Sequence, residues 1–270
     1  MIIGCSDLIR LNEAPDKNIE ILANKYDIQM IELMMDGVCW WEDPSFWRDS
    51  LKNQLEQTGI KLSLHPPTTS MDLSCDSLEL RLFGVSEHLK AIELADELRA
   101  EHVVIHPGFC CESPENRGQA LERTLDSMER LIKSAREAGV KLAVENVGWH
   151  QYSDFSLDEY CNFLEYFHPE EVVALLDVGH AFLNRWSFSE IFQRLGNRLH
   201  ALHLHDNNGI RDQHLPIGQG HLPWEEIWRN LNESSETKYL IFEYAADTPL
   251  SELLNSKQII ERKFCKFVQG

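Results

Sequence analysis

The chain has 270 residues, of which 43% are hydrophobic and 26% are charged, and its 44 acidic and 25 basic residues give a net charge of −19. This length and composition are ordinary for one α/β barrel with its own core, so we expect a single domain over residues 1–270. The acidic balance disfavours a nucleic acid partner, which requires clustered Lys and Arg, and no apolar run is long enough for a membrane span. The seven cysteines are scattered and form no CxxC pair, which argues against a disulfide framework or a zinc ribbon and favours a reducing cytoplasm.

Eight short apolar segments recur along the chain, and an amphipathic stretch lies after each of them. The apolar segments are rich in Leu and β-branched residues and do not alternate strictly, as expected for parallel strands buried on both faces. Apolar residues in the intervening stretches recur about every 3.6 positions, which predicts helices. In chain order we expect strands at 1–6, 28–35, 61–67, 102–108, 141–148, 172–180, 199–206 and 239–245, and helices near 17–26, 46–58, 79–98, 117–138, 157–167, 188–195, 224–232 and 250–266.

This alternation of strands and helices predicts either a closed (β/α)₈ barrel or a doubly wound open sheet. The eightfold count and the chain length favour the barrel. No GxGxxG follows the first predicted strand and no GxxxxGK[ST] occurs, so the usual nucleotide-binding signatures of open sheets are absent from the sequence. We therefore predict an α/β fold of the TIM-barrel type.

Six successive predicted strands, the third to the eighth, end in His, Asp or Glu. Functional side chains of barrel enzymes lie at these C-terminal strand ends. A buried carboxylate costs several kcal/mol unless it is paired or bound to a metal, and the Lys and Arg residues lie mostly in the predicted helices. The pattern predicts a divalent cation, Mn²⁺, Mg²⁺, Co²⁺ or Zn²⁺, held by four of these residues. They are Glu145, Asp177, His203 and Glu243, and His65, His106 and His180 lie at or near the other ends.

The segment after the seventh predicted strand, at 203–224, is too long and glycine-rich for a simple turn. Asp212 and His214 lie two residues apart in it, so their side chains would point the same way in an extended loop. This pair is therefore a further candidate for metal binding, and a solvated loop is the alternative interpretation.

Three segments, VENVG at 144–148, LDVGH at 176–180 and LPIGQGHLPW at 215–224, resemble the sugar phosphate isomerases and epimerases of the xylose-isomerase-like barrel superfamily. The resemblance covers nearly the whole chain. It implies that the predicted four-residue set binds one divalent metal. It also implies a sugar or sugar phosphate substrate, converted by proton transfer through a metal-stabilised enediolate. Glu145 and Glu243 would be the acid/base pair as well as ligands. The substrate would contact His180 and Arg211, and Trp40, Trp41 and Trp149 would pack against the sugar or, alternatively, have an ordinary hydrophobic role.

The sequence is also similar to endonuclease IV of the same superfamily, whose three-metal cluster has nine ligands. A matching residue type stands at every one of them, which implies up to three zinc ions and a phosphodiesterase or AP endonuclease as the alternative function. The segment Pro66–Thr68 after His65, the residue before His180 and the acidic composition depart from that family, so we expect no activity on abasic DNA. A barrel that binds a metabolite without catalysis is a third interpretation, and an oligomer is left open. The nine matching residues are His65, His106, Glu145, Asp177, His180, His203, Asp212, His214 and Glu243.

Overall fold

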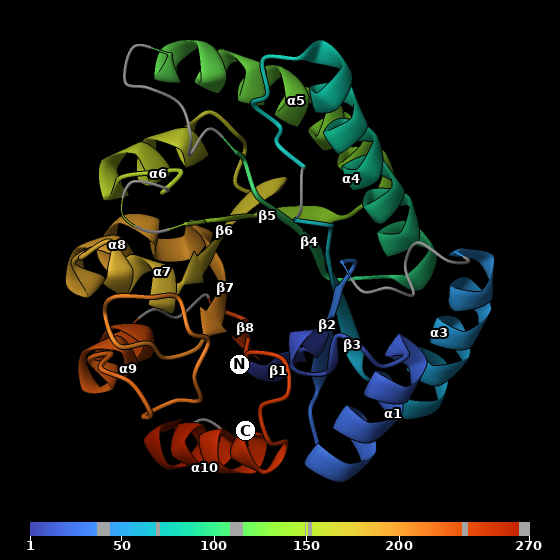
Figure 1. Cartoon of the computed structure of the whole chain (residues 1–270), viewed down its shortest axis with the longest axis vertical. Coiled ribbons are helices and arrows are strands. Elements are labelled where there is room, and N and C mark those ends of the chain that lie inside the picture. The colour runs from blue at the N-terminus through green and yellow to red at the C-terminus, as the bar shows by residue number, and fades with distance from the viewer. Residues whose placement is uncertain are drawn as a thin grey trace.

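The computed structural model describes residues 1–36, 44–68, 71–108, 116–148, 150, 153–233 and 237–264. Its strands pair in parallel and in chain order to close a barrel, and the helices form a ring around them (Figure 1). The predicted (β/α)₈ fold is therefore confirmed. The strands are β1 (Ile2–Ser6), β2 (Met30–Met34), β3 (Lys61–His65), β4 (His102–Ile105), β5 (Lys141–Glu145), β6 (Val172–Asp177), β7 (Leu199–Leu204) and β8 (Tyr239–Phe242).

The helices begin and end where the local chemistry favours a cap. Helix α6 begins after Ser156, whose hydroxyl forms a capping box with Glu159, and α5 ends at Gly139 in a left-handed conformation. No helix in the described ranges is long and apolar enough to cross a membrane. The α-helices are α1 (Pro15–Tyr26), α3 (Pro44–Thr58), α4 (Leu78–Leu98), α5 (Arg117–Ala138), α6 (Leu157–Glu165), α7 (Val178–Leu183), α8 (Phe188–Leu195), α9 (Trp224–Glu233) and α10 (Ser251–Phe264), and η1 (Asp7–Arg10) and η3 (Gly196–Arg198) are short 3₁₀ helices.

The end of the sixth strand was predicted wrongly. We expected a strand over 172–180, but β6 ends at Asp177 and α7 starts at the next residue. The Asp177 side chain accepts a hydrogen bond from the backbone N–H of His180 at 2.6 Å and so caps α7. Because this cap follows the strand directly, the apolar run that we predicted to be one strand contains both the end of β6 and the start of α7.

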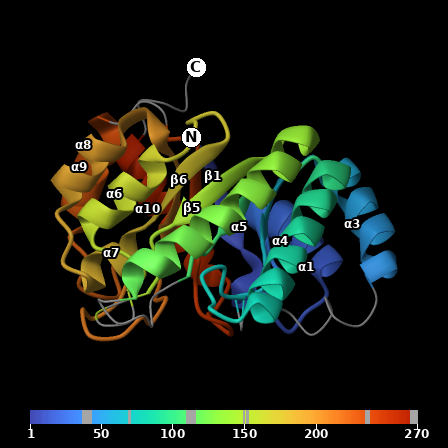
Figure 2. The ribbon, with the colours of Figure 1, turned by 90° about the horizontal axis from the view of Figure 1, so that it is seen from above.

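The barrel interior contains a hydrophobic cluster, and most of its buried charged side chains lie at the C-terminal ends of the strands. Met30, Val104, Leu175 and Ile241 belong to a buried cluster inside the barrel that is separate from the larger core between strands and helices. In Figure 2 the N-terminus lies at the upper edge and the loop between β7 and α9 at the lower edge, so the C-terminal strand ends face downwards. The polar side chains of the candidate site gather at that lower face.

Candidate metal centre

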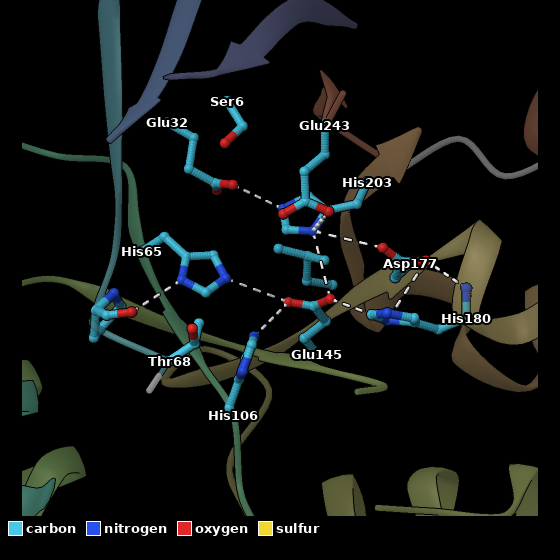
Figure 3. A network of polar contacts seen from close by, with 12 residues as sticks. Ser6, Glu32, His65, Thr68, His106, Glu145, Asp177, His180, His203 and Glu243 are labelled. Carbon is cyan, nitrogen blue, oxygen red and sulfur yellow. Dashed lines mark hydrogen bonds and ion pairs between the residues drawn. The ribbon is translucent and has the colours of Figure 1, made fainter. Parts of the chain in front are cut away.

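Four buried side chains from neighbouring strands form a central group, which we define as Glu145, Asp177, His203 and Glu243. Each offers one ligand atom, and these atoms all lie within 4.8 Å of one another. The Nδ1 atom of His203 lies 3.3 Å from a Glu243 oxygen, 3.6 Å from a Glu145 oxygen and 3.9 Å from an Asp177 oxygen (Figure 3). The structure thus brings together the four residues that the strand ends predicted.

The charges of the central group are those of a cation site. Burial raises the pKa values of Glu145 and Asp177, but the surrounding histidines outweigh it and hold both below their ordinary values. Burial lowers the pKa of His203, but Glu243 and the other carboxylates raise it well above the usual range. Within the described ranges no Lys or Arg pairs with these four residues, and no hydrogen bond reaches Oε2 of Glu243. Three buried carboxylates with one imidazole and an unsatisfied acceptor fit a divalent cation.

A second group lies beside the first and consists of His65, His106 and Glu145. The Nε2 atoms of His106 and His65 lie 3.0 Å and 3.6 Å from Oε2 of Glu145. His65 donates its Nδ1–H to the carbonyl of Pro66, 3.1 Å away, so Nε2 is the ring nitrogen that faces the carboxylate. Although burial lowers the pKa of His65, the nearby glutamates raise it to about 9.

A third group consists of His180, Asp212 and His214. One Asp212 oxygen lies 3.1 Å from Nε2 of His180 and 2.9 Å from Nε2 of His214. His214 donates its Nδ1–H to the backbone carbonyl of Glu243 at 2.9 Å, which leaves Nε2 for a ligand. Helix α7 therefore positions one member of this group, and the loop after β7 positions the other two.

The loop at 206–223 is held against the barrel, in contrast to the solvated loop that was the alternative interpretation. The Asp206 carboxylate is fully buried and accepts hydrogen bonds from the Gly218 amide at 2.9 Å, the Leu222 amide at 3.0 Å and the Trp224 indole at 2.7 Å. The backbone of Asp206 also pairs with Leu215. This carboxylate fixes the loop that carries Asp212 and His214.

Glu145 belongs to two of the groups. Its Oε2 atom faces His65 and His106, whereas its Oε1 atom lies 3.4 Å from Nδ1 of His180 and 3.6 Å from Nδ1 of His203. A carboxylate with this arrangement can bridge two cations. With Glu145 shared, the nine residues that match endonuclease IV form three adjoining groups, and His205, His214 and Glu243 form a further one, so these side chains could hold more than one cation.

Three supporting residues were not predicted as part of the site. His205 is fully buried, lies 2.9 Å from an Asp177 oxygen and stacks on His214 with ring centroids 4.0 Å apart. The side chain of Asn146 bonds both the N–H and the C=O of Asp177, at 2.7 Å and 3.0 Å. Glu32 lies 2.8 Å from Nε2 of His203. The spacing from His203 to His205 places both on one strand face and was a usable signal, whereas Asn146 gave none.

The predicted substrate contacts remain predictions. Trp40, Trp41 and Trp149 lie outside the described residues. Arg211 is exposed on the loop next to Asp212, where its backbone N–H donates to Asn208 at 3.1 Å. His180 lies in the third group.

The comparisons with known proteins agree with this architecture. A family model described as a xylose isomerase-like TIM barrel matches residues 21–263. The chain belongs to this family. The crystal structure of a D-tagatose 3-epimerase-like protein superimposes with a TM-score of 0.87 at 22% identity and covers 98% of both chains.

Two further proteins are similar to this chain. The IOLI protein, in a crystal structure with a bound zinc atom, gives a TM-score of 0.81 at 16% identity over 100% of both chains. The fructoselysine 3-epimerase of Shigella flexneri is 23% identical over 181 residues, which are 64% of this chain and 62% of that protein. At these identities the structural likeness shows the shared barrel.

Proposed function

We propose that this chain is a divalent-metal-dependent isomerase or epimerase of a sugar or a sugar phosphate. The proposal rests on the central group. In it two buried glutamates, one at the end of β5 and one just after β8, each offer a carboxylate oxygen within 4.8 Å of the other ligand atoms. Two relatives of this fold named as 3-epimerases or epimerase-like, and a third with bound zinc, support it.

A divalent cation in the central group would supply the Lewis acidity that polarises a substrate carbonyl. The residues of the chain would then move one proton at the adjacent carbon. Glu243 suits the role of base because its Oε2 atom accepts no hydrogen bond from the described residues. Glu145 would complete the pair by returning a proton to the carbon. Because the surrounding histidines hold its pKa well below the ordinary value, it would first have to take that proton from a neighbour such as His106, whose Nε2 lies 3.0 Å from its Oε2. Burial of both side chains excludes bulk water from the transfer.

The test is exchange of the substrate proton with solvent. Ketohexoses and their phosphates are incubated in D₂O with the Mn²⁺- or Co²⁺-loaded protein, and deuterium incorporation is followed by NMR. Exchange is expected at the carbon next to the carbonyl for at least one sugar, and it should vanish in Glu243→Gln. Glu122→Gln, at an exposed position on α5, is the matched control and should keep the wild-type rate. Exchange that persists in Glu243→Gln contradicts the assignment of the base.

A second candidate function is a phosphodiesterase with up to three zinc ions. One observation favours it, namely that Glu145 directs its two oxygens to two different groups. Metal analysis of the purified protein separates the candidates. Two or three tightly held zinc ions, reduced by His106→Ala and by His214→Ala, would support the polynuclear site. One exchangeable ion that neither substitution affects would exclude it. Abasic duplex DNA should remain uncut, because the net charge of −19 repels it.

A further inference from the structure

Glu32 is a carboxylate in the interior of the barrel, below the central group. It lies on β2 two residues from Met30, so both side chains face the barrel axis. A cluster of hydrophobic side chains packs around Met30 in the interior, and Glu32 is fully buried. No Lys or Arg pairs with it within the described ranges. An ionised carboxylate in such a place costs several kcal/mol unless its neighbours compensate for lost water.

The neighbours of Glu32 are two histidines and a serine. Its Oε1 atom lies 2.8 Å from Nε2 of His203 (Figure 3). Its Oε2 atom accepts a hydrogen bond from the Ser63 hydroxyl at 3.0 Å. His102, on β4, lies 3.7 Å from Oε2. Glu32 therefore has a close polar neighbour at each of its two carboxylate oxygens.

The contact with Glu32 determines which nitrogen of His203 is left to face Glu145 and Glu243. The proton of a neutral His203 belongs on Nε2, because this nitrogen has the nearest carboxylate oxygen, at 2.8 Å on Glu32. Nδ1 lies 3.3 Å and 3.6 Å from Glu243 and Glu145 and is the nitrogen left for a cation. His65 and His214 are oriented in the same way, but by the uncharged backbone carbonyls of Pro66 and Glu243. A charged acceptor behind a histidine increases its basicity as a ligand more than a neutral one does.

We propose that Glu32 is a positioning residue which, through Nε2 of His203, makes the central group the tightest cation site of the chain. Ser63 assists by holding the second oxygen of Glu32. The inference rests on the metal dependence proposed above.

The test measures the dissociation constant of Co²⁺ alone, without substrate, by titration of its visible absorption. Glu32→Gln keeps the shape of the side chain and removes its charge, and it should weaken binding of the first Co²⁺ by about 10–100-fold. Ser63→Ala keeps the charge and loosens the carboxylate, and it should weaken binding several-fold. Glu87→Gln is the matched control, because Glu87 is a buried carboxylate on α4 that pairs with Lys90 at 2.6 Å and, in the described part of the chain, with no member of the central group. Its Co²⁺ affinity should equal that of the wild type.

The outcomes separate this inference from the proposed function. If Glu32→Gln folds, as judged by circular dichroism, and its dissociation constant for Co²⁺ is within twofold of the wild-type value, the role of Glu32 is overturned. The proposed function is not affected by that result. If Glu32→Gln does not fold, Ser63→Ala decides, and an unchanged dissociation constant in that variant overturns the inference. A wild-type protein that binds no Co²⁺ overturns the proposed metal dependence together with it.

Discussion

Gly179, in the first turn of α7, lies against the ring of His205, and replacing it with Ala tests how the site is supported. The added Cβ would lie 2.0 Å from Cε1 and 2.6 Å from each ring nitrogen of His205. The ring is confined, because it is fully buried, bonds Asp177 at 2.9 Å and stacks on His214. Gly179 is not among the residues with positive φ, so Ala is strained only by this contact.

The expected cost of Gly179→Ala follows from two terms. Overpacking a filled interior costs about 1–3 kcal/mol. Displacing His205 from the Asp177 carboxylate loses a buried hydrogen bond to a charged group, which costs about 1.5–3 kcal/mol. The better helix propensity of Ala offsets about 1 kcal/mol. The net destabilisation is about 2–5 kcal/mol, and at about 2–4 °C per kcal/mol the melting temperature should fall by roughly 10 °C.

The measurement is calorimetric melting of the metal-free protein, followed by Co²⁺ titration. Because Asp177 loses its partner, Co²⁺ affinity should fall together with the melting temperature. Gly118→Ala in α5 is the control, since its added Cβ would meet nothing within 4 Å and should raise stability by up to about 1 kcal/mol. If Gly179→Ala melts at the wild-type temperature with unchanged Co²⁺ affinity, His205 does not support Asp177 and the reasoning is refuted.

The remaining predictions concern pH and the loop after β7. Burial lowers the pKa values of His65 and His214, but facing carboxylates raise both to about 9 in the metal-free chain, against about 6.5 when unfolded. Their stabilisation is therefore complete below pH 6.5 and lost as pH rises through 9, so the melting temperature of the metal-free protein should fall across this window; equal values at both ends would count against the ion pairs. Co²⁺ affinity, measured by titration, should rise across the same window, because the ligands must lose their protons. Asp206→Ala frees the Trp224 indole and two amides of the loop at 206–223, so limited proteolysis should cut that loop faster than in the wild type, and an unchanged rate would show that the loop is held by other contacts.

The strands and the central group could be predicted because the relevant information is local in the sequence. A parallel strand buried on both faces is a continuous apolar run, and the residue after it marks the C-terminal end. Glu145 and Glu243 follow such runs directly. The same signal misplaced the end of β6, since the apolar run continues into α7 and the cap that separates the two elements is Asp177 itself.

Glu32 could not be recognised as part of the site from its position in the sequence. It lies on β2 and its partner His203 on β7, and these strands are not neighbours in the barrel. Their contact crosses the barrel interior, so it depends on strand tilt and register and not on any spacing along the chain. The hydrogen bonds between Asn146 and the backbone of Asp177 could not be predicted either. Every residue has the same backbone groups, so the sequence does not show which residue a side chain will bond in this way.

Asp177 has two functions in one side chain, since it offers an oxygen to the central group and receives the backbone N–H of His180. A cation bound to this carboxylate would therefore act on the first hydrogen bond of α7 and on the local opening equilibrium of that helix. Amide hydrogen exchange in the first turn of α7 should then change when a metal is added. NMR of the His180 amide would thus detect metal binding without a substrate and without a spectroscopically active metal.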